Sequence, residues 1–185
     1  MSTLASKAQL RASFLRWALF AVPAVLLVSF LVQTFTPGGG DSAWFASLEK
    51  PAIHPPNYLF GIVWPILYAL MGFALALVLA AWGAKGRTLA IIAFAAQLAI
   101  NLAWSPVFFG MQQIGWALWV ILAMDVAVVV TLVLFWRVRT LAGVLLLPYL
   151  AWILFATVLN YQFLELNPDA SGRGDSEGAV QVIEF

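Results

Sequence analysis

The sequence predicts an all-α integral membrane protein, built as a bundle of five transmembrane helices. Three observations lead to this prediction: a very apolar composition, five long segments with few charges, and basic residues that fall between alternate segments. The chain has 185 residues, of which 64% are hydrophobic and only 9% are charged. A soluble domain of this size cannot bury that much apolar surface, so the lipid bilayer is the expected solvent.

Five segments are long and apolar enough to form transmembrane helices, each of which needs about 20 apolar residues. Residues 88–124 carry no charge but are too many for one helix. The sequence GMQQIG at 110–115 divides them, because glycine and glutamine favour a tight turn there. The predicted spans cover residues 14–35, 58–82, 88–109, 113–136 and 141–164.

These spans form a single predicted domain, residues 1–167, with a first loop at residues 36–57. The tail at residues 168–185 is rich in Gly, Asp, Glu and Ser, and we expect it to be disordered because it cannot bury enough apolar surface to fold. Basic residues precede the first span, as they do in a signal peptide. Its apolar run is too long for a signal peptide, however, and no clean cleavage site follows, so we expect an anchor helix.

Basic residues concentrate on one side of this five-span arrangement. Seven lie before or at the start of the first span, between the second and third, or between the fourth and fifth: Lys7, Arg11, Arg16, Lys85, Arg87, Arg137 and Arg139. Only Lys50 and Arg173 fall on the other side. The positive-inside rule therefore predicts a cytoplasmic amino terminus and an external first loop. No transit peptide is evident, so a bacterial inner membrane is the expected location.

Composition argues against several classes of function. The chain has no cysteine, which excludes thiol catalysis and disulfides. It has a single histidine, so a metal centre is not expected. The formal net charge of +1 argues against nucleic acid as a partner.

Polar and aromatic side chains recur along one face of three predicted spans. They are Trp64 and Tyr68 in the second span, Gln97, Asn101, Trp104 and Ser105 in the third, and Tyr149, Trp152, Ala156 and Asn160 in the fifth. Amides are costly in hydrocarbon unless they are paired, so these faces should point into the bundle. Together they would form a pocket suited to a flat, mostly apolar ligand. Packing and interhelical hydrogen bonding without a ligand is the alternative interpretation.

Asp125 is the only acidic residue inside a predicted span. An intramembrane carboxyl group is a candidate functional residue. A carboxyl group that lies near water, or that stays neutral, fits the sequence as well. No basic residue in a neighbouring span offers Asp125 a partner.

Three segments of the chain resemble one known family of membrane proteins. They are KPAIHPPNYLFGIVWPILYALMG at 50–72, AQLAINLAWSPVFFGMQQIGWAL at 96–118 and LLPYLAWILFATVLNY at 146–161. These segments are similar to the first loop with the second helix, the third helix with its following turn, and the fifth helix of the TspO/MBR family. That family comprises tryptophan-rich sensory proteins and translocator proteins, once called peripheral-type benzodiazepine receptors. The resemblance runs from about Trp44 to Asn167 in consistent order.

The resemblance implies a membrane receptor, transport or sensor protein, often a homodimer, that needs no cofactor. Its ligands would be porphyrin-like tetrapyrroles and isoquinoline or benzodiazepine-type compounds, bound among the helices under the first loop. By the same resemblance, Trp64, Asn101 and Trp152 are expected ligand contacts. Residues expected to line or adjoin the pocket are Tyr68, Trp104, Tyr149 and Ala156.

The segment EKPAIHPPN at residues 49–57 is then expected to act as a lid over the pocket. Pro51, Pro55 and Pro56 lower the entropy cost of holding it in place. His54 could donate to a ligand carboxylate or change its charge near neutral pH, whereas a solvated loop histidine is the alternative.

Two departures from the family pattern bear on function. Ile53 stands where the family usually has tryptophan, a residue linked to light-dependent porphyrin breakdown. Leu159 and Tyr161 are followed by no Lys or Arg as far as residue 165, so the proposed sterol pattern is incomplete. The alternatives to a receptor or transporter are a light-dependent porphyrin-degrading enzyme and a ligand-free structural protein.

Overall fold

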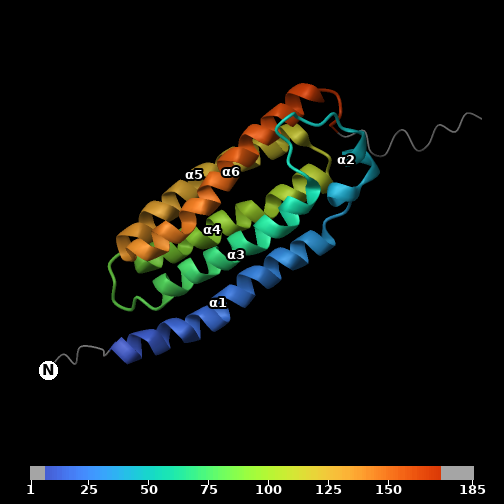
Figure 1. The fold of residues 1–185 in the computed structure, drawn as a ribbon. Helices are drawn as coiled ribbons and strands as arrows, with labels where there is room; N and C mark the ends of the chain where they lie inside the picture. Colours follow the sequence, from blue (N-terminus) through green and yellow to red (C-terminus); the bar gives the residue numbers. More distant parts are fainter. Residues whose placement is uncertain (1–6, 172–185) are drawn as a thin grey trace, which may run out of the picture.

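The computed structural model describes residues 7–171, and every regular element within that range is a helix (Figure 1). Five of these helices are long and apolar enough to cross a membrane. They are α1 (Lys7–Phe35), α3 (Asn57–Leu79), α4 (Arg87–Ser105), α5 (Ile114–Val138) and α6 (Thr140–Leu166). The fold is an all-α bundle of five membrane-length helices, as the sequence predicts.

Four of the long helices form a ring, and α1 lies outside it. Around the ring, α3 packs on α6, α6 on α5, α5 on α4, and α4 closes back on α3. Helix α1 rests on α3 and touches α4 only slightly, and Figure 1 shows it in blue along one flank of the bundle. Inside the ring, Met71, Val128 and Tyr149 are fully buried and belong to one apolar core.

Small side chains permit the close contact between α1 and α3. A Cβ atom on Gly72 would lie 2.6 Å from the Cα atom of Val22, so only glycine lets these two backbones come so close. Ala74 and Ala76, on the same helix, are fully buried. These small residues of α3 therefore serve contacts within the chain.

The turn after α3 starts earlier than the sequence predicts. Helix α3 ends at Leu79, and the following turn contains Gly83 and Gly86 with φ of +75° and +78°. Glycine adopts this left-handed conformation at little cost. The side chain of Arg87 donates hydrogen bonds to the carbonyl oxygens of Val78 at 3.2 Å and Leu79 at 2.9 Å. These bonds add donors for carbonyl groups at the helix end, where intrahelical N–H partners run out.

The third span continues past α4 as a wider turn. Residues Pro106–Gly110 form a π-helical turn, η2. Proline has no N–H to donate, and its ring crowds the turn before it. The N–H of Met111 reaches back five residues to the carbonyl oxygen of Pro106 at 2.8 Å, which is the π-helical spacing. The widened turn buries the side chain of Phe108.

The first loop, residues 36–56, has regular structure of its own. It contains a 3₁₀ turn, η1 (Gly39–Asp41), and a short helix, α2 (Ala43–Ser47). Ser42 caps α2, because its hydroxyl oxygen accepts a 3.1 Å hydrogen bond from the backbone N–H of Phe45. An irregular strap, residues 48–56, then leads into α3, with a turn closed by a 2.9 Å hydrogen bond from the N–H of His54 to the carbonyl oxygen of Pro51.

Residues beyond α6 hold the strap in place. The backbone N–H of Glu49 donates to Oδ1 of Asn167 at 2.8 Å, and Nδ2 of Asn167 donates to the carbonyl oxygen of Glu49 at 3.0 Å. Nε1 of Trp44 donates to the carbonyl oxygen of Ala170 at 3.1 Å. The predicted disordered tail begins at residue 168, and Ala170 within it takes part in this contact region. The rest of that tail, including Arg173, lies outside the described residues.

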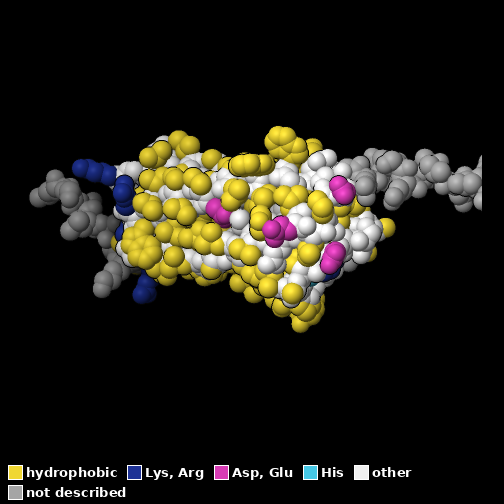
Figure 2. Space-filling model, turned by 90° about the horizontal axis from the view of Figure 1, so that it is seen from above, with side chains coloured by type: hydrophobic (Ala, Val, Ile, Leu, Met, Phe, Trp, Pro, Cys, Tyr) yellow, Lys and Arg dark blue, Asp and Glu magenta, His cyan; other side chains and the backbone are white. Residues whose placement is uncertain are grey.

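Charged side chains are distributed unevenly along the bundle (Figure 2). Most Lys and Arg side chains gather at the end where α1 begins, whereas the Asp and Glu side chains lie along the middle and toward the other end. The described basic side chains near the first end are Arg11, Arg16, Lys85, Arg87, Arg137 and Arg139. We call this the basic end and the opposite one the loop end.

Candidate functional site: a cavity beneath the first loop

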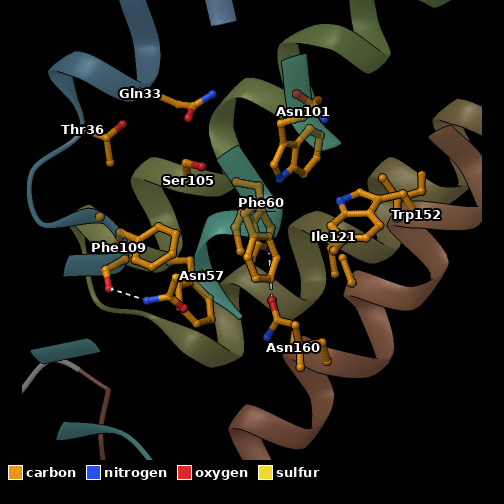
Figure 3. Close-up of a pocket in the computed structure, with 18 of the residues that line it drawn as sticks. Gln33, Thr36, Asn57, Phe60, Asn101, Ser105, Phe109, Ile121, Trp152 and Asn160 are labelled. Carbon is orange, nitrogen blue, oxygen red and sulfur yellow. Dashed lines mark hydrogen bonds between the residues drawn. The ribbon is translucent and has the colours of Figure 1, made fainter. Parts of the chain in front are cut away.

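A cavity of about 510 Å³ lies at the loop end, among the five long helices. All five of these helices, η2 and the first loop contribute to its lining. Figure 3 shows Gln33 of α1 and Thr36 of the first loop on one side, and Trp152 of α6 and Ile121 of α5 on the opposite side. The volume lies within the range of about 300–1,000 Å³ that is usual for small-molecule sites. We call it the central cavity.

The residues predicted as ligand contacts or neighbours lie around this cavity, with one exception. The lining includes Trp64, Tyr68, Asn101, Trp104, Trp152 and Ala156. Tyr149 lies outside the lining and is fully buried. Of the predicted lid residues, His54 lines the cavity, whereas Pro51, Pro55 and Pro56 do not. The prolines shape the strap that brings His54 to the cavity.

Aromatic rings form most of the wall. Trp64 stacks on Tyr68 with ring centroids 5.3 Å apart and an interplanar angle of 27°. Trp104 stacks on Phe108 at 4.9 Å and 22°. Trp152 meets the ring of Phe60 edge to face at 5.8 Å. Such contacts fix the rings in place, so the wall presents rigid apolar faces to the cavity.

A chain of buried hydrogen bonds lies beneath the aromatic wall. The hydroxyl group of Tyr68 donates to Oδ1 of Asn101 at 2.8 Å, and Nδ2 of Asn101 donates to the hydroxyl oxygen of Tyr149 at 2.9 Å. The hydroxyl group of Tyr149 donates in turn to Oε1 of Gln97 at 3.1 Å. Tyr149 therefore belongs to a second layer, because it supports Asn101 and does not face the cavity.

Two indole N–H groups beside the cavity differ in their partners. Nε1 of Trp104 donates to Oδ1 of Asn160 at 3.0 Å, and Nδ2 of Asn160 donates to the carbonyl oxygen of Ile114 at 3.1 Å. Nε1 of Trp152 is buried and has no hydrogen-bond partner among the described residues. A buried donor without a partner costs free energy. The N–H of Trp152 is therefore available to a ligand, whereas the N–H of Trp104 is already paired.

The roof of the cavity contains His54 within a cluster of apolar rings. Its ring centroid lies 5.9 Å from that of Phe45, 5.8 Å from that of Phe60 and 5.5 Å from that of Phe163. Burial lowers the pKa of His54 below its ordinary value of 6.5, and the positive charge of Lys50 lowers it further. The imidazole is therefore neutral at pH 7.

The lining as a whole is uncharged at neutral pH. Among its described residues there is no Asp, Glu, Lys or Arg. Lys50 lies nearby, but its ammonium group donates to the carbonyl oxygens of Phe45 and Leu48 and stands over the Phe45 ring. Burial lowers the pKa of Lys50 as well. A charged group of a ligand would therefore meet no oppositely charged side chain within the lining, and would be placed at the mouth of the cavity.

Several lining residues were not among the predicted site residues. They are Gln33, Thr36, Gly39, Gly40, Phe45, Asn57, Tyr58, Phe60, Gly61, Ser105, Phe108, Phe109, Ile121, Met124, Ile153, Leu159, Asn160 and Phe163. The sequence offered a signal for Ser105 and Asn160, which lie on the polar faces of their spans. Gln33 and Thr36 come at the end of the first span, where polar residues are expected at any helix end.

Asp125 lies away from the cavity. It is on α5, and the hydroxyl group of Thr157 on α6 donates to its Oδ2 at 2.8 Å. Asp125 is not part of the cavity lining. Its described contact is therefore an interhelical hydrogen bond between α5 and α6.

Comparison with known proteins identifies the family. A profile of the TspO/MBR family matches residues 20–166. The chain is 43% identical to the tryptophan-rich protein TspO of Chlorobaculum tepidum over 144 residues, which cover 77% of this chain and 90% of that protein. It is 43% identical to the tryptophan-rich sensory protein of Cereibacter sphaeroides, over 82% of this chain and 92% of that protein. It is 42% identical to the translocator protein of Homo sapiens, over 71% of this chain and 79% of that protein. The chain belongs to the TspO/MBR family of integral membrane proteins.

Proposed function

We propose that the central cavity binds a porphyrin-like tetrapyrrole, and that the protein works as a receptor, sensor or transporter for it. The observation that carries the proposal is the meeting of Trp64, Trp104 and Trp152, from three helices, around one cavity of about 510 Å³. Isoquinoline and benzodiazepine-type compounds, which are smaller and flat, suit the same cavity. The names of the relatives, translocator and sensory protein, agree with this role.

Burial of a flat apolar ring system supplies the main driving force. Each Å² of apolar surface removed from water contributes about 25 cal/mol. Indole and phenyl faces add offset-stacked or edge-to-face contacts of about 0.5–1.5 kcal/mol per pair. The rigid stacks of Trp64 on Tyr68 and of Trp104 on Phe108 lower the cost of ordering the site.

Hydrogen bonding to the ligand falls mainly to Trp152. The amide group of Asn101 already bonds to Tyr68 and Tyr149, whereas the Trp152 N–H has no partner among the described residues. A ligand acceptor, such as a carbonyl oxygen or an unprotonated ring nitrogen, therefore pairs with Nε1 of Trp152. Carboxylates of a tetrapyrrole point to the mouth, because the lining holds no basic side chain apart from neutral His54.

A titration of the purified, detergent-solubilised chain with protoporphyrin tests this proposal. We expect saturable quenching of tryptophan fluorescence in the native chain. We expect a loss of affinity of about tenfold or more in Trp152→Ala, since the variant loses both apolar area and the unpaired donor. Trp116→Ala is the matched control, because Trp116 is 68% exposed and outside the lining. Equal affinities in native chain, Trp152→Ala and Trp116→Ala would overturn the assignment of the site.

We also propose a homodimer in which α4 faces its copy. Ala95 and Ala96 on α4 are exposed, so a second helix can approach closely there. The chain has no cysteine, which permits single-cysteine crosslinking without background. We expect Ala95→Cys to form a covalent dimer on mild oxidation in membranes. Ala151→Cys, exposed on α6, is the control that should stay monomeric.

A further inference from the structure

A second hollow lies at the basic end of the bundle, far from the first loop. Its volume is about 560 Å³. Helix α3 forms its floor, because both α1 and α6 pack on α3. Its lining residues are Leu10, Arg11, Phe14, Phe73, Leu77, Ala80, Arg139, Thr140, Leu141 and Leu145. We call it the basic-end groove. It shares no lining residue with the central cavity.

The walls of the groove are apolar and open to the surroundings. Leu10, Phe73 and Leu141 are large side chains, yet 47%, 39% and 58% of their surface is exposed. Phe14, Leu77 and Leu145 complete the same wall. In a bilayer, this surface faces hydrocarbon, so a lipid acyl chain can lie along the groove beside the helices.

Two arginines from distant parts of the chain line this groove. Arg11 comes from α1, and Arg139 comes immediately before α6. Both are exposed, and neither side chain has a hydrogen bond or an ion pair with any other residue in the described range 7–171. Arg87, at the same end, is different: it bonds to carbonyl oxygens and stands over the Trp82 ring at 4.3 Å. Arg11 and Arg139 therefore keep their charge and their donors available for a ligand.

Acidic side chains do not compete for these two arginines. The acids with described side chains are Glu49 in the first loop, Asp125 in the middle of α5, Glu165 at the end of α6 and Asp169 beyond it. Figure 2 shows the basic side chains at one end with no described acid among them on the visible face. The electrostatic complement of the groove must come from outside the described chain.

We propose that the basic-end groove binds one anionic glycerophospholipid, such as phosphatidylglycerol. The phosphate pairs with Arg11 and Arg139, whose planar guanidinium groups match the geometry of phosphate oxygens. The hydroxyl group of Thr140, at the first turn of α6, is a further donor beside it. An acyl chain lies against Phe14, Phe73 and Leu145. The basic end of a membrane bundle is where anionic headgroups gather.

The combination of walls and charges favours a lipid over a free phosphate ion. A free phosphate would use the two arginines but would leave the apolar wall uncovered. A zwitterionic lipid would use the wall but would bring its own ammonium group next to the arginines. Only an anionic lipid satisfies both parts of the groove. The groove would thus bind a different class of ligand from the central cavity.

Native mass spectrometry of the full chain tests the proposal, with the protein released from nanodiscs of equal phosphatidylglycerol and phosphatidylcholine content. We expect one retained phosphatidylglycerol in the native chain. In Arg11→Gln/Arg139→Gln, we expect its retention to fall about 10- to 30-fold, since each basic group near an anionic headgroup contributes about a factor of five. Arg16→Gln/Arg137→Gln removes the same charge at the same end from outside the lining, and retention should change less than about threefold.

Two further measurements make the result decisive. Ala80→Trp keeps both arginines but fills the apolar floor, so it should also lose the lipid. Soluble glycerol phosphate, added at the same phosphate concentration, should not displace it. Equal loss in the two double variants, equal retention of phosphatidylcholine, or displacement by glycerol phosphate would each overturn the proposal. Circular dichroism confirms that each variant keeps its helices, which the exposed positions of both arginines lead us to expect.

Discussion

The hydroxyl group of Tyr68 on α3 donates a 2.8 Å hydrogen bond to the amide oxygen of Asn101 on α4. The nitrogen of the same amide donates to Tyr149 on α6. One carboxamide thus joins three helices directly beneath the central cavity. The amide of Asn101 therefore links helices before it can contact a ligand. Loss of its hydrogen bonds should affect the stability of the bundle more than the affinity for a ligand.

Replacement of Tyr68 by Phe should therefore lower stability more than affinity. The variant leaves Oδ1 of Asn101 without its partner, which costs about 1 kcal/mol, as interhelical hydrogen bonds in membranes usually do. The melting temperature in detergent should fall, while protoporphyrin affinity should change less than about threefold. A large loss of affinity with an unchanged melting temperature would show that Tyr68 contacts the ligand through its hydroxyl group.

His54 should make the first loop sensitive to acid. Its pKa is lowered in the folded chain, so the unfolded chain binds the proton at a higher pH than the folded chain does. The stabilising contribution is therefore complete above pH 6.5 and is lost as the pH falls through the lowered pKa. Protoporphyrin release, followed by stopped-flow fluorescence, should accelerate as the pH falls below 6.5. His54→Phe keeps a ring among Phe45, Phe60 and Phe163 without a charge, so its release rate should not show this rise.

Gly72 should be one of the least replaceable small residues in the bundle. A methyl group at this position would lie 2.6 Å from the Val22 backbone, so Gly72→Ala forces α1 away from α3. We expect a destabilisation of about 1–3 kcal/mol, as is typical of overpacking. Gly115→Ala is the control, because its added Cβ atom would meet only Leu164 at an ordinary 3.8 Å. Thermal unfolding in detergent compares the two, and equal melting temperatures would contradict the close approach.

The bonds between Glu49 and Asn167 should control how fast the cavity opens. Asn167→Ala removes both of them and frees the strap, so protoporphyrin association and release should both accelerate severalfold, with a smaller change in affinity. Tyr161→Phe removes an exposed hydrogen bond to Glu165 on the same helix and should leave both rates unchanged. If the two variants behave alike in stopped-flow mixing, the strap does not gate the cavity.

Illumination should distinguish a binding protein from a porphyrin-degrading enzyme. Ile53, at the position where the family usually has tryptophan, is 42% exposed and does not line the cavity. We expect the bound porphyrin of the native chain to keep its absorbance spectrum under light for as long as it does with Ile53→Val. A new product band that depends on the native chain and is lost in Trp64→Phe or Trp152→Phe would instead favour the enzymatic alternative.

The sequence predicts the long helices well because membrane spans are fixed by local composition. The differences arise at helix ends. Helix α1 begins at Lys7, ahead of the predicted residue 14, because its basic first turns continue the same helix beyond the apolar run. The early end of α3 comes with the left-handed turn at Gly83 and Gly86. Glycine permits this backbone conformation but does not require it, so the sequence alone does not fix where the helix ends.

The arrangement around the cavity was only partly predictable. The polar faces of the spans placed Trp64, Asn101 and Trp152 toward a common space, since an unpaired amide cannot face lipid. The same reasoning could not separate Tyr149 from the lining. Helical periodicity shows which side chains face the bundle interior, but not which of them reach the cavity. The contribution of Gln33 on α1 and of Thr36 just after it depends on how an outer helix rests on its neighbour, which is a property of tertiary packing.

The hydrogen bonds that Trp44 and Glu49 make to residues beyond α6 also set the shortest polypeptide that keeps the first loop tied to the bundle. Removal of everything after Leu166 would leave the Glu49 peptide groups and the Trp44 indole facing solvent or empty space, although all five apolar spans would be intact. Such a truncated chain would still insert into a membrane and would look complete to any hydropathy plot. Expression clones should therefore extend past Ala170, and a purification handle is better placed ahead of α1, at the opposite pole of the bundle.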